Sequence, residues 1–330
     1  MSPIPSDEAL SILIGFPKQR LYRISRDMHN HIDHLLLHDK LKPHKPRPIV
    51  SAKNDLRVIQ ESILKNVFYN RLNPSRYSFG NKGIKCNAEE HLNNRFRLTI
   101  DIRNCFPSIK YRHLLDTFRR NRIYGSAINL LIALCTYKEE LKQGFSTSPI
   151  LADSVLSIID HRIGQCANQM NVIYTRFVDD MSFSAMHDLQ EYECGLFRIV
   201  VTALIENGFS INTDKTNDTN SASEEVLITK LRMHSNTVNV PKEYFAEYQT
   251  IIFDLKSYAD GGELQGNYYT QGQMLGKANY IKWINPKRSR EVLALMRKVN
   301  WKRAEERGAA DGLIAYKRTW TEKANTIVNN

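Results

Sequence analysis

The feature of this sequence that most constrains its fold is a pair of adjacent aspartates, Asp179 and Asp180, inside the mainly apolar stretch RFVDDMSFSA (residues 176–185). Adjacent negative charges repel each other, and moving a carboxylate out of water into apolar surroundings is costly unless the charge is compensated. Both flanks, residues 174–178 and 181–183, contain residues that favour strands. The stretch therefore predicts a β-hairpin whose turn carries the two acids.

A third acid, Asp101, lies in the segment LTIDI, where apolar residues alternate as they do in a strand. A lone buried aspartate there would be costly unless it were paired or bound to a metal. If this strand lies beside the hairpin, three carboxylates meet and offer the oxygen ligands that Mg²⁺ prefers. Two such ions, about 4 Å apart, can clamp the attacking and leaving oxygens of a phosphoryl transfer. The three acids therefore predict a site for two Mg²⁺ ions.

The charge and the cysteines narrow the class of protein. A net charge of +11 on 330 residues favours an anionic partner, most often nucleic acid. The five cysteines are scattered without a C-x-x-C pair, so neither a zinc site nor a disulfide framework is expected. The N-terminal residues do not read as a signal peptide, and no apolar run approaches the length of a membrane span. We therefore expect a cytoplasmic protein without membrane association.

The order of the expected elements indicates the fold class. Residues 7–40 have the spacing of a helix, and the Pro-rich segment that follows is expected to be extended or a loop. Strands then alternate with helices, including a strong amphipathic helix over residues 150–170. This order suits an α+β protein with helices on one face of its sheet. The last ninety residues are mostly helical and increasingly basic.

Four segments resemble, in order and spacing, the palm motifs of reverse transcriptases: LTIDIRNCFPSI, QGFSTSPILADSVL, IYTRFVDDMSFS and NTDKT. Two more are similar to the retron type of that family. NAEEH (residues 87–91) matches its N-A-x-x-H motif, and ITK (residues 228–230) stands where V-T-G is usual. Phe177 takes the place of the usual Tyr in the Y-x-D-D box.

The resemblance implies an RNA-directed DNA polymerase, a nucleotidyltransferase of the α+β class shaped as a right hand. The palm would be an antiparallel sheet with helices on one face, and the thumb would be short and helical. The expected divisions are the N-terminal segment and fingers over residues 1–95, the palm with inserted fingers helices over 96–240, and the thumb with basic C-terminal helices over 241–330.

The resemblance also assigns roles to single residues. Asp101, Asp179 and Asp180 match the family's metal-binding triad. The backbone carbonyl of Ile102 would complete the coordination of the metal ion on the nucleotide side. The residues expected to contact the incoming deoxynucleoside triphosphate (dNTP) are Arg47, Phe106, Gln143, Gly144 and Lys215. Phe106 would exclude a ribose 2′-OH by steric contact. The alternatives are a core aromatic at Phe106 and a solvated turn lysine at Lys215.

The retron type implies that the partner is a cognate non-coding RNA, which supplies both template and primer. The DNA product would form a branched RNA–DNA hybrid (msDNA), in anti-phage defence with a separate effector protein. The residues expected to contact this RNA or to support the contact are Asn87, His91, Thr229 and Lys230. Two alternatives stay open: a defence-associated or unclassified bacterial reverse transcriptase without branched priming, and a non-catalytic RNA-binding scaffold.

Overall fold

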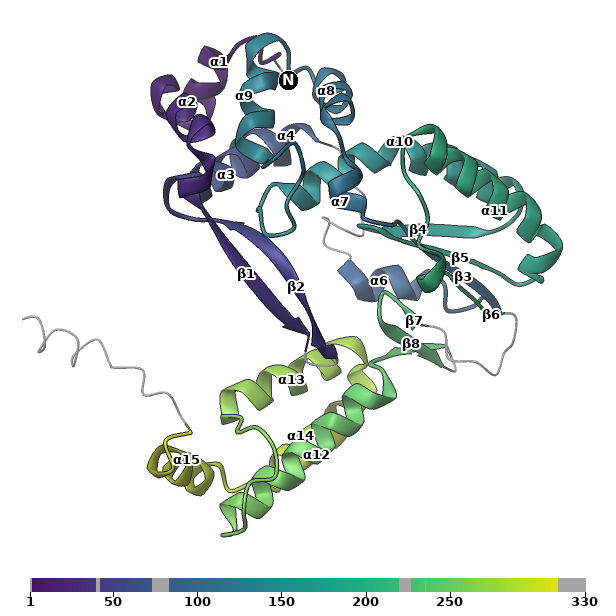
Figure 1. Cartoon of the computed structure of the whole chain (residues 1–330). Coiled ribbons are helices and arrows are strands. Elements are labelled where there is room, and N and C mark those ends of the chain that lie inside the picture. Colours follow the sequence, from purple (N-terminus) through teal and green to yellow (C-terminus); the bar gives the residue numbers. More distant parts are fainter. Residues whose placement is uncertain (1, 40–41, 73–82, 220–226, 235, 314–330) are drawn as a thin grey trace, which may run out of the picture. The chain divides into compact units, whose positions relative to one another are not determined.

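A computed structural model describes residues 2–39, 42–72, 83–219, 227–234 and 236–313 (Figure 1). The chain separates into two compact units, Met1–Glu224 and Glu225–Asn330, and each is described by itself. The expected division into fingers, palm and thumb, with boundaries after residues 95 and 240, stays a prediction.

The first unit contains a four-stranded sheet with the strand order β4-β5-β3-β6, in which every neighbouring pair is antiparallel. Its strands are β3 (Phe96–Asp101), β4 (Ile173–Phe177), β5 (Asp180–Ala185) and β6 (Asn217–Thr219). Residues alternate between the two faces of a strand. Leu98 and Ile100 therefore share one buried apolar face with Met181 and Phe183, their partners across the ladder. The predicted strand and hairpin lie side by side, and the α+β class is confirmed.

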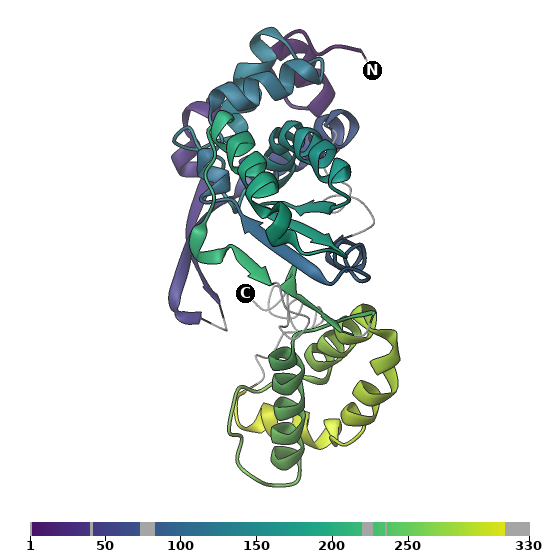
Figure 2. The same cartoon turned by 90° about the vertical axis from the view of Figure 1, so that its right-hand side faces the viewer.

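Two long helices, α10 (Ser148–Gln169) and α11 (Leu189–Glu206), lie on one face of this sheet (Figures 1 and 2). The first turns of α10 are buried almost all round, since Ile150, Leu151 and Ala152 have no exposed surface. The short helix α6 (Gly83–Glu89) lies against β4 on the other side of the sheet (Figure 1). The helices that cover the sheet are therefore mainly, but not wholly, on the expected single face.

Most of the remaining helices of the first unit form a layer beside the sheet (Figure 1). They are α1 (Asp7–Ile14), α2 (Lys18–Arg26), η1 (Met28–His31), α3 (Asn54–Ile63), η2 (Leu64–Phe68), α4 (Tyr69–Arg71), α7 (Cys105–Ser108), α8 (Tyr111–Arg120) and α9 (Gly125–Cys135). The short helix η3 (Thr213–Lys215) lies against β3 instead. Helix α9 packs against α1, α2, α3 and α8, and this layer shares one hydrophobic core with the sheet.

A long antiparallel hairpin of β1 (Ile32–Asp39) and β2 (Lys42–Ala52) leaves this layer (Figure 1). The prediction of a helix over residues 7–40 is therefore wrong beyond the short helical turn at Met28–His31. Three prolines hold β2 out of helical geometry and leave it extended, as expected. The strand beginning at Ile32 then pairs with this extended segment, from Ile32 opposite Ala52 onwards.

The second unit combines a three-stranded antiparallel sheet with helices. Its elements are β7 (Leu227–Ile228), β8 (Leu231–His234), β9 (Thr237–Asn239), α12 (Lys242–Ala259), α13 (Gln271–Ile284), η4 (Pro286–Arg288), α14 (Ser289–Met296) and α15 (Trp301–Ala310). Its core includes two fully buried tyrosines of α12, and the hydroxyl of Tyr248 donates a hydrogen bond of 3.2 Å to the carbonyl of Val292. Among the described residues, no helix combines the length and apolar character needed to span a membrane.

Candidate active site

The ends of β3 and β5 bring the predicted acids to one edge of the sheet. In the antiparallel register Asp101, the last residue of β3, stands directly opposite Asp180, the first residue of β5. The backbone N–H of Ile102 donates a hydrogen bond of 3.2 Å to the carbonyl of Asp179. Directly opposite residues in such a ladder have their Cβ atoms about 5 Å apart. The side chains of Asp101, Asp180 and Asp179 therefore leave the backbone at neighbouring points.

Asp101 is held by two neighbours that follow α11 in the chain. The ammonium of Lys215 lies 3.2 Å and 3.1 Å from the two carboxylate oxygens of Asp101. The side-chain amide of Asn212 donates a hydrogen bond of 2.9 Å to Asp101 Oδ1, and its backbone N–H bonds the carbonyl of Asp101 at 2.8 Å. The structure thus places the predicted Lys215 beside the triad, where it compensates the charge of Asp101.

The charges around the triad bear on whether it could hold a divalent cation. The pKa of Asp179 is raised, first by burial and then by the negative charge of Asp101. A positive ion between the two carboxylates would offset their repulsion, and at Asp101 Lys215 already supplies a positive charge. Within the described part of the chain, no group of three or more His, Cys, Asp or Glu is gathered tightly enough to hold a metal as it stands. The carboxylate oxygens are thus of the type that hard divalent cations prefer, and Asp101 is engaged by Lys215 in this arrangement.

A buried arginine holds the turn that precedes Asp179. Val178 has a φ of +56°, in the left-handed region that a β-branched residue rarely adopts. The guanidinium of Arg176 donates a hydrogen bond of 2.5 Å to the carbonyl of Val178. It also donates to carboxylate oxygens of Asp153 at 2.8 Å and of Asp160 at 2.6 Å, both on α10. Because the side chain of Arg176 is 1% exposed, this network ties the turn to the interior of the unit.

The sequence reasoning missed Arg176, its two acidic partners and Asn212. A signal was present: an arginine within an apolar strand requires buried partners. Asp153 and Asp160 are seven residues apart on one predicted helix, and that spacing places them on the same face. Their pairing with the strand depends on how α10 packs on the sheet, which local patterns do not reveal.

Phe106 lies in α7, the short helix that begins directly after β3. The chain turns at Asn104, whose φ of +47° is left-handed. Phe106 itself is 8% exposed and belongs to the hydrophobic core of the first unit. It therefore has a packing function, as the alternative interpretation expected, and its selection against ribonucleotides stays a prediction.

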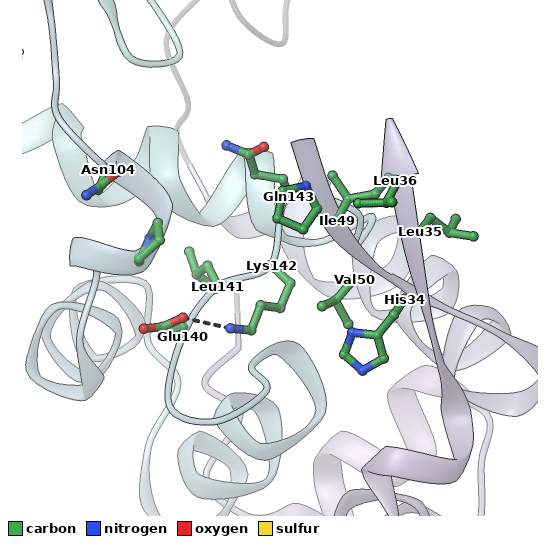
Figure 3. A pocket seen from close by; sticks show the side chains of 12 residues that line it. His34, Leu35, Leu36, Ile49, Val50, Asn104, Glu140, Leu141, Lys142 and Gln143 are labelled. Atoms are coloured by element: carbon green, nitrogen blue, oxygen red, sulfur yellow. Dashed lines mark hydrogen bonds and ion pairs between the residues drawn. The ribbon is translucent and has the colours of Figure 1, made fainter. Parts of the chain in front are cut away.

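A cavity of about 560 Å³ lies between the β1–β2 hairpin, the start of α7 and the loop before α10 (Figure 3). Of the predicted dNTP contacts, Gln143 lines this cavity, together with Asn104 and Val50. Lys142 also lines it and forms an ion pair of 2.7 Å with Glu140. The cavity therefore combines polar groups with an apolar wall from the hairpin.

Gly144 lies against strand β2, and Arg47 belongs to that strand. A Cβ atom on Gly144 would lie 2.5 Å from the carbonyl oxygen of Val50, so the glycine permits a close approach to the backbone of β2. The close approach that Gly144 permits is therefore to protein backbone. Arg47 has its backbone in β2, opposite Leu37, while its side chain falls outside the described residues. A dNTP contact by either residue stays a prediction.

Asn87 and His91 of the NAEEH segment are fully buried against the sheet. His91 Nδ1 lies 2.6 Å from the hydroxyl of Ser184, and Nε2 lies 2.7 Å from that of Thr175. Direct contact with RNA, the first of the two expected roles, does not fit this structure, because neither side chain reaches solvent. The other expected role, support of the RNA contact, stays a prediction.

The burial of His91 predicts a pH-dependent stability. Burial, with a smaller contribution from the charge of Arg97, lowers the pKa of His91 from 6.5 to about 3. Between these values the unfolded chain binds a proton that the folded chain does not. The free energy of unfolding should therefore fall as the pH drops below 6.5, by up to about 1.4 kcal/mol per pH unit.

The measurement is urea denaturation at several pH values for the wild type and His91→Gln, with exposed His29→Gln as the matched control. The His91 variant should lose this part of the pH dependence, and the control should keep it. Equal slopes in all three proteins would contradict the assignment.

Thr229 and Lys230 form the two-residue turn between β7 and β8 of the second unit. Their φ values are +48° and +62°, as in a type I′ turn, where Asn-Gly is preferred. Thr229 is buried, and its hydroxyl donates a hydrogen bond of 2.7 Å to the carbonyl of Ile228. Lys230 is exposed at the end of the hairpin. The lysine thus occupies a conformation that glycine adopts more easily, and the expected RNA contact of both residues stays a prediction.

Comparison with known proteins identifies the class. Residues 38–252, well over half of the chain, match the family model described as reverse transcriptase (RNA-dependent DNA polymerase). The chain therefore belongs to the reverse transcriptase family.

Within that family its relatives include retron enzymes, which confirms the retron type expected from the sequence. The chain is 30% identical to the Retron Ec86 reverse transcriptase of Escherichia coli, over 62% of this chain and 64% of the relative. It is 24% identical to the Retron Se72 reverse transcriptase of Salmonella heidelberg (strain 579083-10), over 73% and 65%. The chain thus spans just under two thirds of the length of these two relatives. Among solved structures, a foamy viral protease-reverse transcriptase in complex with double-stranded DNA overlaps at a TM-score of 0.44 and 13% identity, over 77% of this chain and 38% of that chain.

Proposed function

We propose that this protein is an RNA-directed DNA polymerase that extends a DNA chain on an RNA template with two Mg²⁺ ions. Its membership of the reverse transcriptase family supports the reaction class. The observation that carries the chemistry is the register of β3 and β5, which sets Asp101 opposite Asp180 with Asp179 in the adjoining turn. Catalysis of phosphoryl transfer consists mainly of positioning and charge stabilisation, and clustered carboxylates that bind cations serve both.

In the proposed site, Asp101 and Asp179 would hold both ions, and Asp180 would support them. The backbone carbonyl of Ile102 would complete the coordination of the ion nearer the nucleotide. When bound, the ions stabilise the negative charge that develops on the attacking and leaving oxygens. Lys215, whose side chain is 57% exposed, exchanges its contact with Asp101 for the leaving pyrophosphate and stabilises its charge.

The incoming dNTP lies between the triad and the hairpin in this proposal. Gln143 lines the cavity that the hairpin bounds (Figure 3). Gly144 keeps the same loop close to β2, and the positive charge of Arg47 serves the triphosphate. These contacts are those that the reverse transcriptase motifs imply for the corresponding positions.

Phe106→Ala is expected to admit ribonucleotides. Removing the ring would open the space that a ribose 2′-OH needs, because Phe106 follows Asp101 by five residues, at the position where the family carries a bulky aromatic. The ratio of dCTP to CTP incorporation in primer extension should fall about tenfold or more, since a clash with a hydroxyl is worth over 1 kcal/mol. The melting temperature must be measured alongside, because Phe106 is also a core residue. An unchanged ratio in a folded variant would show that Phe106 serves packing alone.

The similarity to retron reverse transcriptases supports a more specific proposal about the partner of this protein. We propose that a cognate structured RNA supplies template and primer, that a 2′-OH of this RNA starts the DNA, and that the branched hybrid acts in anti-phage defence with a separate effector. Lys230 contacts this RNA from the exposed turn of the second unit, and buried Thr229 supports that turn. Asn87 and His91 support an RNA-binding surface of the first unit from beneath it.

Sequencing the nucleic acid that co-purifies with the protein, before and after RNase and debranching treatment, tests the branched product. DNA joined to RNA through a debranching-sensitive bond is expected. DNA that carries no such bond would favour the alternative, a bacterial reverse transcriptase without branched priming.

A further inference from the structure

The second unit carries a row of aromatic side chains with a lysine among them. Tyr244 of α12 and Tyr280 of α13 meet edge to face, with ring centroids 5.5 Å apart, and Tyr280 is 6.2 Å from the ring of Trp283. The ammonium of Lys277 lies 4.9 Å from the ring centroid of Tyr244 and 5.7 Å from that of Tyr269. We call these five residues the aromatic row.

The aromatic row reaches the surface at one end. Trp283 is 48% exposed, whereas the other four residues of the row are half-buried. Lys277, Tyr280 and Trp283 follow each other at three-residue spacing, which places them along one side of α13. Lys277 also forms an ion pair of 3.3 Å with Glu247. The lysine therefore has both an acidic partner and two aromatic partners within this unit.

The surroundings of the aromatic row are basic. Lys282 is exposed on the same helix, and Lys287 and Arg290 are exposed just after it. Between residues 277 and 303 the chain has nine Lys or Arg and a single acid, Glu291. An exposed indole with half-buried rings behind it and exposed cations beside it matches a nucleic-acid strand, whose bases stack on rings while its phosphates meet the cations.

We propose that the aromatic row stacks on unpaired bases of single-stranded RNA. Bases inside a duplex present only their edges, so stacking on the exposed indole face favours a base that has left its pair. The ring planes of the row are inclined to one another by 71° and 38°, which suits bases splayed out of a regular stack. The choice of RNA rests on the proposed function, since the template of such an enzyme is RNA.

The test is equilibrium binding of short labelled oligonucleotides, followed by fluorescence anisotropy without dNTPs. Three probes are used: single-stranded oligouridine RNA, a duplex RNA of equal length, and single-stranded DNA of the same sequence. Trp283→Ala should weaken binding of the RNA strand about tenfold or more, because stacking on one aromatic ring is worth about 1–3 kcal/mol per base. Binding of the duplex should change less than twofold, and Trp283→Phe should retain most of the affinity.

A matched control is Leu275→Ala, which removes an exposed apolar side chain of the same helix, 44% exposed and without a ring on which a base could stack. It should bind the RNA strand like the wild type. If Trp283→Ala lowers the melting temperature, Trp283→Leu takes its place. Unchanged affinity of a folded Trp283 variant, an equal loss on the duplex, or a loss confined to DNA would each overturn the proposal. Because no synthesis is measured, this result is independent of whether the protein polymerises DNA.

Discussion

Asp179→Asn and Asp180→Asn are each expected to abolish DNA synthesis while the protein stays folded. Each change removes a negative charge from the site proposed for two Mg²⁺ ions. Such ions supply several kcal/mol of transition-state stabilisation, so the rate of primer extension should fall by about 10³-fold or more. The melting temperature of Asp179→Asn should not fall, because burial and the charge of Asp101 raise the pKa of Asp179 and its ionised form is already disfavoured in the fold.

The control for this pair is Asp116→Asn, the same chemical change at an exposed position of α8. It should extend a primer like the wild type. Calorimetry should show that Mg²⁺ binding is weakened in the two variants of the turn and retained in the control. Normal extension by a folded variant carrying both turn substitutions would contradict the assigned chemistry.

Arg176→Met is expected to have the largest effect on stability. It would leave two buried or half-buried carboxylates, on Asp153 and Asp160, without the guanidinium that compensates them. Removing one member of a buried ion pair costs about 3–5 kcal/mol of unfolding free energy. The carbonyl of Val178 would lose its donor as well, so the turn before Asp179 would no longer be fixed. Urea denaturation measures the first effect, and Mg²⁺ binding below the unfolding transition measures the second.

The matched control is Arg162→Met, which removes an arginine paired with Glu206 at the surface, where both side chains are about half exposed. Surface pairs contribute about 0–1 kcal/mol, so this variant should be nearly as stable as the wild type. Arg176→Lys keeps the positive charge but loses the forked donors of the guanidinium. Its free energy of unfolding should lie between those of Arg176→Met and Arg162→Met. Equal stabilities for the Met variants at the two positions would show that the buried network does not hold the fold.

The sequence predicted the parts of the site that depend on local patterns. Alternation around Asp101 and around the Asp179–Asp180 pair indicated a strand and a hairpin, and their pairing places the acids together. Lys215 was also expected, because NTDKT resembles a palm motif, and it lies against Asp101. These features follow from short segments whose spacing is visible in the chain.

Other parts depend on contacts between distant segments. Residues 32–39 were expected to be helical, yet they form a strand because a Pro-rich partner lies opposite them. The polar residues of NAEEH suggested a surface contact, but tertiary packing buries His91 on two hydroxyls of the sheet. Likewise, no local pattern shows that Arg176 reaches α10. In each case the deciding interaction joins elements that are far apart in sequence.

The most direct test of the proposed polymerase function is synthesis on a defined template. The purified protein is incubated with an RNA strand annealed to a DNA primer, all four dNTPs and Mg²⁺, and the product is sequenced. DNA complementary to the RNA is expected with the wild type and Asp116→Asn, and none is expected with Asp179→Asn or when EDTA removes the metal. Failure of the folded wild-type protein to make complementary DNA on this template or on its co-purified RNA, or synthesis that persists in Asp179→Asn, would contradict the proposed function.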